Sequence, residues 1–118
     1  NDCFVADIII VGAGPAGSVA AKKLRSDYEF TVSLYEKERL PRHNYCAGYT
    51  PHKAIKALDS IGTIAENFEL KIRGCRIQGG DEILDLEFEG SEDDLPGNAY
   101  REEFDYFLTQ LAAVSGTR

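Results

Sequence analysis

The chain contains few cysteines. Its 118 residues include three, Cys3, Cys46 and Cys75, which lie far apart and form no Cys-x-x-Cys pair. A zinc site needs about four closely spaced ligands, and the two histidines, His43 and His52, do not complete such a set. The sequence therefore predicts no metal site, and free thiols of this kind are typical of cytoplasmic proteins.

Long hydrophobic runs and a basic N-terminal segment are also missing. The longest apolar run, residues 8–11, is far short of the roughly 20 residues that a membrane-spanning helix requires. The first seven residues contain two acids and no Lys or Arg, unlike the start of a signal peptide. We therefore expect a cytoplasmic protein without a transmembrane segment.

Basic residues are scarce in the last third of the chain. Residues 1–80 carry 11 Lys or Arg against 9 Asp or Glu, whereas residues 81–118 carry 2 against 11. This balance disfavours a nucleic-acid partner, because Lys and Arg must displace the counterions of a phosphate backbone. With 43% hydrophobic and 28% charged residues, the composition otherwise fits one soluble globular domain.

A glycine-rich segment lies between a predicted strand and a predicted helix. Residues 7–11 have the length of a strand and, after Asp7, only β-branched apolar side chains, which predicts a parallel strand buried on both faces. A helix is predicted over residues 15–26, with Pro15 in its first turn. Residues 30–36 alternate apolar and polar side chains, which predicts a second strand. This order indicates an α/β chain that starts with a Rossmann-like βαβ unit.

The spacing of the glycines predicts a phosphate-binding loop. Gly12 permits the tight turn out of the strand, Gly14 leaves room for a pyrophosphate, and Gly17 lets the helix pack closely. The N-terminus of the helix attracts phosphate through its N–H groups and dipole. Glu36 ends the second strand, where a carboxylate accepts hydrogen bonds from a ribose. We predict an adenine-dinucleotide site; the acid disfavours NADP, and the spacing leaves FAD and NAD open.

The middle of the chain predicts a loop followed by a short helix. Residues 37–50 are rich in turn formers and basic groups. Thr50 is expected to cap the helix, with Pro51 as its first residue, and Gly62 is expected to end it.

Two strands and a last helix are predicted beyond that helix. The alternation over residues 70–77 changes parity at Gly74, which predicts a bulge with Cys75 in the core. Residues 79–81 predict a hairpin turn, and residues 84–88 predict an antiparallel strand with one face in water. The last helix is predicted to start near Arg101 and end at Gly116, because apolar residues recur there at helical spacing: Phe104, Phe107, Leu108, Leu111 and Ala112.

Three stretches, taken in order, carry a more specific resemblance. Residues 7–18 hold the glycine motif, and residues 40–48 read Leu-Pro-Arg-His-Asn-Tyr-Cys-Ala-Gly before Thr50-Pro51. Residues 100–105 place Arg-x-x-Phe-Asp at the start of a helix. The combination resembles the geranylgeranyl reductase family of FAD-dependent enzymes, in the superfamily of para-hydroxybenzoate hydroxylase. It covers nearly the whole chain.

The resemblance implies a fold and a cofactor. Residues 1–118 would form the N-terminal part of an FAD-binding domain, with an antiparallel hairpin insertion and without the substrate domain. The expected cofactor is FAD, and no catalytic residue is assigned. The expected cofactor-binding residues are Gly12, Gly14, Pro15, Ala16, Gly17, Glu36, Lys37, Arg42, Cys46, Ala47, Gly48 and Arg101.

The resemblance also implies a reaction and partners. In such enzymes the reduced flavin delivers hydride to isoprenoid double bonds of lipids or pigment precursors. Such a substrate implies peripheral access to a membrane surface. The family continues with a strand expected beside residues 8–11, so an unpaired edge there predicts self-association. Tyr49 stands where the family usually has a small residue.

Three alternative functions stay open on the sequence. The chain could be an FAD-binding or dinucleotide-binding module without catalysis of its own. It could belong to a related flavin hydroxylase or quinone-linked dehydrogenase, because fold similarity does not separate these chemistries. It could also be a small NAD-binding Rossmann protein.

Overall fold

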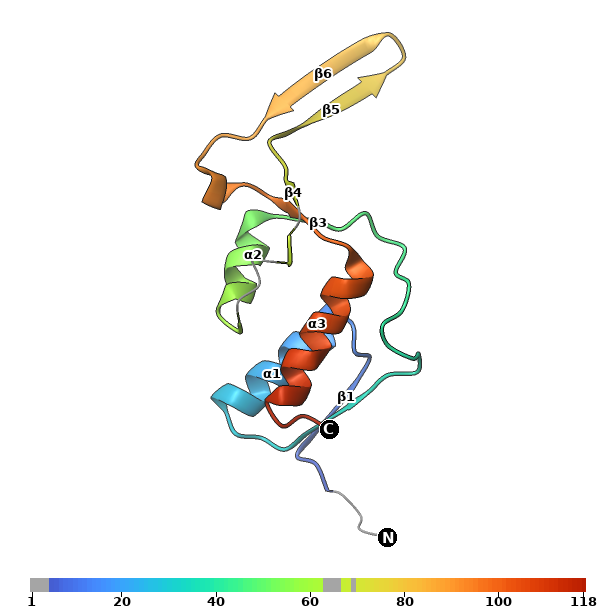
Figure 1. The fold of residues 1–118 in the computed structure, drawn as a ribbon, viewed down its shortest axis with the longest axis vertical. Helices are drawn as coiled ribbons and strands as arrows, with labels where there is room; N and C mark the ends of the chain where they lie inside the picture. Colours follow the sequence, from blue (N-terminus) through green and yellow to red (C-terminus); the bar gives the residue numbers. More distant parts are fainter. Residues whose placement is uncertain (1–4, 63–66, 69) are drawn as a thin grey trace. The chain divides into compact units, whose positions relative to one another are not determined.

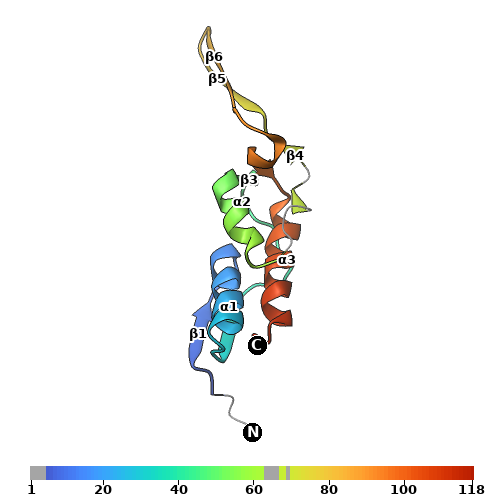
Figure 2. The ribbon, with the colours of Figure 1, turned by 90° about the vertical axis from the view of Figure 1, so that its left-hand side faces the viewer.

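The computed structural model describes residues 5–62, 67–68 and 70–118. The chain divides into two compact units. The first unit consists of residues 1–45 and 101–118, and the second unit consists of residues 46–100. Figures 1 and 2 show the elements of both units in two views.

The first unit starts with the predicted βαβ arrangement. Strand β1 (Ile8–Val11) pairs in parallel with strand β2 (Val32–Tyr35), and helix α1 (Pro15–Asp27) connects them. Pro15 occupies the first turn of α1, as predicted, where its missing N–H costs no hydrogen bond. The sequence therefore predicted the Rossmann-like start correctly, with bounds that differ by one or two residues.

Two helices cover one face of this sheet. Helix α3 (Arg101–Val114) lies beside α1, and their contact is closed by small side chains. Ala21 of α1, Val32 of β2 and Ala112 of α3 are fully or almost fully buried there. The partly buried side chains packed against this cluster are Ile8, Ile10, Leu24 and Leu34.

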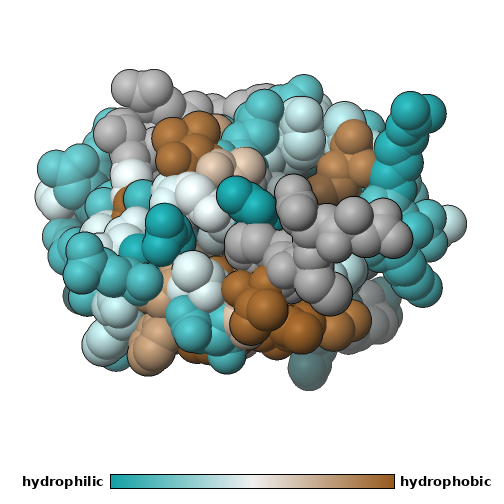
Figure 3. Space-filling model, turned by 90° about the horizontal axis from the view of Figure 1, so that it is seen from below, coloured by the Kyte–Doolittle hydropathy of each residue, from teal (hydrophilic) through white to brown (hydrophobic). Residues whose placement is uncertain are grey.

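The other face of the sheet is exposed, contrary to the prediction that β1 is buried on both faces. Ile9 is 64% exposed and Val11 is 85% exposed. The reason is that α1 and α3 both lie on the face of Ile8 and Ile10. On the opposite face Ser33 of β2 is buried, whereas the described residues leave Ile9 and Val11 of β1 largely uncovered. Figure 3 shows brown, hydrophobic patches among hydrophilic residues on the surface seen from below.

The end of the chain corrects the expected strand order. The N–H of Leu34 donates to the Arg118 carbonyl (2.6 Å), and the N–H of Arg118 donates to the Val32 carbonyl (3.1 Å). The segment after α3 thus lies along β2, not along β1, because Gly116 (φ +98°) turns the chain back to that edge. Among the described residues β1 pairs only with β2, so self-association through its other edge stays a prediction.

The second unit contains a small antiparallel sheet of three strands. Strand β7 (Gly97–Asn98) lies between β3 (Tyr49–Thr50) and β4 (Leu70–Lys71). Helix α2 (His52–Asp59) packs on it through Ile55, which is buried with Phe68 and Leu95. A short 3-10 turn, Glu92–Asp94, precedes β7.

The start and end of α2 differ from the prediction. Pro51 is the N-cap, and the Thr50 hydroxyl donates to the Gly48 carbonyl (3.3 Å) instead of capping the helix. Thr50 is held in β3 by pairing with β7, so the predicted loop ends before Tyr49. The helix ends at Asp59, with Ser60 as its C-cap, before the predicted stop at Gly62.

Strands β5 (Gly74–Gly79) and β6 (Glu82–Glu87) form the predicted hairpin. Its two-residue turn contains Gly80 with φ +62°. The bulge predicted at Gly74 is wrong: the parity changes because β4 and β5 belong to different sheets. Cys75 is exposed rather than buried, since both faces of the hairpin lack a covering element among the described residues.

No helix in the described part of the chain is long and apolar enough to cross a membrane.

Candidate dinucleotide-binding site

The glycine loop of the first unit is open on its outer side. Gly12 adopts φ +105°, a conformation that favours glycine, and its N–H donates to the Tyr35 carbonyl (2.7 Å). Gly14 is the N-cap of α1, whose first turn contains no acidic residue. A Cβ added at Gly12 or Gly14 would meet no atom within 4 Å. This free space beside a helix N-terminus suits a pyrophosphate, so the loop fits a dinucleotide.

Gly17 has a different task. A Cβ at this position would lie 1.9 Å from the Gly12 carbonyl oxygen and 3.3 Å from a side-chain carbon of Ile10. The first turn of α1 can therefore approach the end of β1 only because residue 17 has no side chain. The sequence predicted this close helix–strand packing from the spacing of the motif.

Glu36 reaches the same loop from the end of β2. Its Oε2 accepts a hydrogen bond from the Ala13 N–H (2.8 Å), and its Oε1 accepts one from the Glu38 N–H (3.0 Å). The hydrogen bond from the Glu38 N–H contributes most to holding the pKa of Glu36 below its ordinary value. The hydrogen bond from the Ala13 N–H and the charge of Arg42 lower it further. The carboxylate is thus ionised, and each oxygen keeps a lone pair for a further donor such as a ribose hydroxyl.

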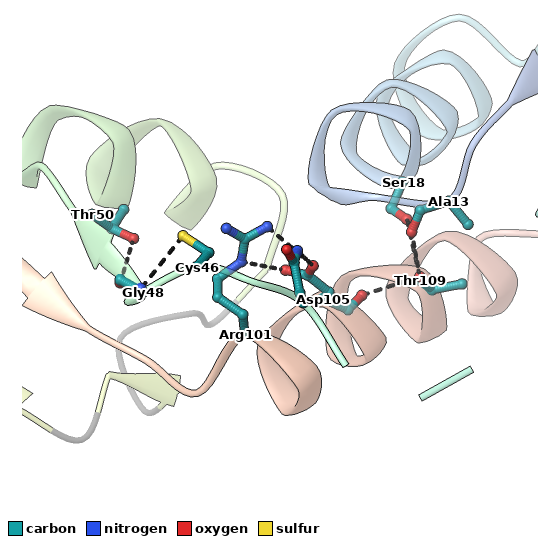
Figure 4. A network of polar contacts seen from close by, with 9 residues as sticks. Ala13, Ser18, Cys46, Gly48, Thr50, Arg101, Asp105 and Thr109 are labelled. Atoms are coloured by element: carbon teal, nitrogen blue, oxygen red, sulfur yellow. Dashed lines mark hydrogen bonds and ion pairs between the residues drawn. The ribbon is translucent and has the colours of Figure 1, made fainter. Parts of the chain in front are cut away.

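Two hydroxyls fix the glycine loop from the opposite side. The Ser18 hydroxyl of α1 is fully buried and donates to the Ala13 carbonyl (3.1 Å). Thr109 of α3 places its hydroxyl 3.2 Å from the same carbonyl oxygen and 3.0 Å from the Ser18 hydroxyl (Figure 4). Local sequence predicts neither hydrogen bond, because α1 and α3 bring these two hydroxyls together only when the helices pack on each other.

Arg101 forms a second polar cluster in the first unit. Its guanidinium donates through Nε and Nη2 to the two carboxylate oxygens of Asp105 (2.7 and 3.0 Å). Asp105 also accepts a hydrogen bond from the side-chain amide of Asn44 (2.8 Å). Figure 4 shows Arg101 and Asp105 on the first turns of α3 and Thr109 one turn further. Helix α3 thus presents one polar face with residues at intervals of four.

The basic loop after β2 lies in the first unit as well. Lys37 is exposed and Arg42 is half-buried, and both line an open surface hollow with His43 and Tyr45. The rings of His43 and Tyr45 pack edge to face, with their centroids 4.7 Å apart. Arg42 acts on Glu36 through its charge, which connects this loop to the strand end.

The Cys46-Ala47-Gly48 loop belongs to the second unit. Gly48 is buried with φ +85°, and a Cβ there would lie 2.0 Å from the Ala99 carbonyl oxygen. The Ala99 N–H donates to the Gly48 carbonyl (3.3 Å), so β7 fixes the loop. Cys46 and Ala47 are exposed. Tyr49, which follows the loop and belongs to β3, pairs with Asn98 of β7.

The structure therefore brings part of the predicted set together. The glycine loop and Glu36 meet at hydrogen-bond distance, and Arg42 acts on Glu36. Arg101 lies on α3 of the same unit, while Cys46, Ala47 and Gly48 lie in the other. Among the described residues, no group of three or more His, Cys, Asp or Glu side chains is arranged to hold a metal ion.

The fold and the glycine loop together are those of the dinucleotide-binding class of α/β proteins. The chain belongs to the pyridine nucleotide-disulphide oxidoreductase family, whose family model matches residues 6–109. The resemblance drawn from the three sequence stretches is confirmed by a solved structure of a geranylgeranyl bacteriochlorophyll reductase-like protein of Thermoplasma acidophilum. That structure is 28% identical with a TM-score of 0.75, over 95% of this chain.

Two further proteins resemble this chain. It is 31% identical to the menaquinone reductase of Mycolicibacterium smegmatis over 118 residues, which is 96% of this chain. A myxobacterial chondrochloren halogenase, described as FAD-dependent, shares the fold with a TM-score of 0.77 at 22% identity over 98% of this chain. The chain spans 28% of the length of each of these three relatives.

Proposed function

We propose that this chain binds FAD and forms the cofactor-binding part of a geranylgeranyl reductase-like enzyme that reduces isoprenoid double bonds. The observation that carries the proposal is the ionised Glu36 carboxylate, which is bonded to the Ala13 N–H beside an open glycine loop. When FAD is bound, its flavin supplies the hydride chemistry. The 28% identity to the reductase-like structure supports this reductase assignment.

The residues of the first unit have separate tasks in this proposal. The N-terminus of α1, with Pro15, Ala16 and Gly17 in its first turn, attracts the pyrophosphate through N–H groups and the helix dipole. Gly12 and Gly14 leave the space that the phosphates occupy. Glu36 accepts hydrogen bonds from the adenosine ribose. The other residues proposed to contact the cofactor are Lys37, Arg42, Cys46, Ala47, Gly48 and Arg101.

FAD binding is tested by titrating the purified chain with FAD, NAD and NADP and following flavin fluorescence and calorimetric heat. We expect FAD to bind and NADP to fail, because a 2′-phosphate would meet the charge of Glu36. A chain that binds NAD and not FAD would replace the proposal by a small NAD-binding protein. If the chain binds FAD but does not turn over a prenyl substrate in the presence of a reductant, it is a binding module.

A second candidate reaction is the reduction of a quinone. It is favoured by the 31% identity to the menaquinone reductase, which covers 96% of this chain. Reoxidation of the dithionite-reduced flavin-loaded chain distinguishes the two reactions. Oxidation by a menaquinone analogue, with none by a geranylgeranyl substrate, would favour the quinone reaction.

Glu36 gives a pH prediction for the same titration. Hydrogen bonds from the Glu38 and Ala13 N–H groups hold its pKa below its ordinary value, so the carboxylate stays charged until the pH falls through that lowered value. FAD affinity should therefore be constant at neutral and mildly acidic pH, and it should fall only when the pH drops below the ordinary range of a glutamate pKa. Glu36→Gln should bind about tenfold more weakly with no such fall, and Glu38→Gln, an exposed neighbour, should match the native chain. An affinity of Glu36→Gln equal to that of the native chain would contradict the ribose assignment.

A further inference from the structure

Thr109 is the distant residue that contacts the glycine loop. It lies 96 positions after Ala13, yet its hydroxyl oxygen is 3.2 Å from the Ala13 carbonyl oxygen. The same hydroxyl is 3.0 Å from that of Ser18 and 3.1 Å from the Asp105 carbonyl oxygen. In Figure 4 the Thr109 side chain points from α3 towards Ala13 and Ser18 of the loop and α1.

Both backbone polar groups of Ala13 form hydrogen bonds with side chains. Its N–H donates to the Glu36 carboxylate (2.8 Å), and its carbonyl accepts the Ser18 hydroxyl (3.1 Å) with Thr109 beside it. The residue is 3% exposed, so these groups face the protein and not water. Side chains from α1, α3 and the end of β2 thus fix the two consecutive peptide planes on either side of Ala13.

This arrangement determines where the next N–H points. In a trans peptide the carbonyl and the N–H point in opposite directions. The Ala13 carbonyl is directed towards Ser18 and Thr109 between the two helices, so the N–H of Gly14 in the same peptide is directed away from them. A Cβ at Gly14 would meet no atom within 4 Å, so that side of the loop is open.

We propose that Thr109 is a positioning residue of the dinucleotide site. Its hydroxyl holds the Ala13–Gly14 peptide so that the Gly14 N–H is presented to the pyrophosphate of the bound dinucleotide. The inference rests on the proposed function, and it assigns to α3 a role in binding that the glycine motif alone does not contain. Thr109 itself does not contact the ligand.

The test compares ligands with and without a pyrophosphate. Thr109→Val keeps the shape of the side chain and removes the hydroxyl, whereas Thr109→Ser keeps the hydroxyl. We expect Thr109→Val to bind FAD and ADP about tenfold more weakly than the native chain does, and to bind adenosine equally well. Thr109→Ser should bind all three ligands within about twofold of the native chain. If Thr109 only joined the two helices, its substitution by Val would weaken the binding of all three ligands together or of none.

The outcomes separate this inference from the proposed function. If the native chain binds neither FAD nor ADP, the proposed function fails and the inference fails with it. If the native chain binds both and Thr109→Val binds them equally well, only the inference is overturned. An NMR titration of the native chain with ADP gives a check that needs no variant, since the Gly14 amide resonance should shift strongly. An unshifted Gly14 amide would overturn the inference even if Thr109→Val did not fold.

Discussion

Gly17→Ala should lower the melting temperature of the chain by on the order of 10 °C or more. The added Cβ would lie 1.9 Å from the Gly12 carbonyl oxygen, and backbone on both sides of the contact leaves no flexible group to move aside. Overpacking of this kind costs about 3 kcal/mol, which outweighs the gain of roughly 1 kcal/mol in helix propensity from Gly to Ala. Thermal unfolding followed by circular dichroism measures the effect.

Gly14→Ala is the matched control, with the opposite pattern. Its Cβ would meet no protein atom within 4 Å, and its φ of −69° is accessible to any residue. The melting temperature should change little, because alanine at an N-cap costs only about 1 kcal/mol. FAD binding should be lost, since the methyl group enters the space proposed for the pyrophosphate. Equal destabilisation by the two substitutions would contradict the separate tasks assigned to these glycines.

The glycine loop shows what local sequence can predict. Gly12, Gly14, Gly17 and Glu36 lie in one βαβ unit, and their spacing in the sequence reflects the geometry of that unit directly. Both strands, the connecting helix and the hairpin turn follow from equally local patterns. These parts of the fold, together with the last helix from Arg101 (α3), were predicted correctly from the sequence.

The errors arise where the outcome depends on distant residues. The parity change at Gly74 has the same signature for a bulge and for a change of sheet, and only the pairing of β4 with β7 distinguishes them. The apolar sequence of β1 predicted a strand buried on both faces, because apolar residues alone do not determine which elements cover each face. Thr109 and Asn44 gave no signal, since their partners lie 96 and 61 positions away and depend on the packing of α3.

The second large effect is expected for Asp105→Ala. The Asp105 carboxylate accepts two hydrogen bonds from Arg101 and one from Asn44, and its side chain is only 7% exposed. The Arg101 side chain is 19% exposed, so removal of the carboxylate leaves a largely buried cation without this partner. Breaking one side of a buried ion pair costs about 3 kcal/mol, and the melting temperature should fall accordingly.

The chain contains an exposed ion pair of the same geometry. Arg76 donates to Asp85 through Nε and Nη2 (2.6 and 2.8 Å), but the two side chains are 66% and 57% exposed. Water replaces the lost partner at such a site, so Asp85→Ala should leave the melting temperature almost unchanged. Equal effects of the two substitutions would show that burial does not decide the contribution of these pairs. A large effect confined to Asp105→Ala would instead support a role for its buried carboxylate in fixing the loop at Asn44 to α3, because this carboxylate is bonded to both Asn44 and Arg101.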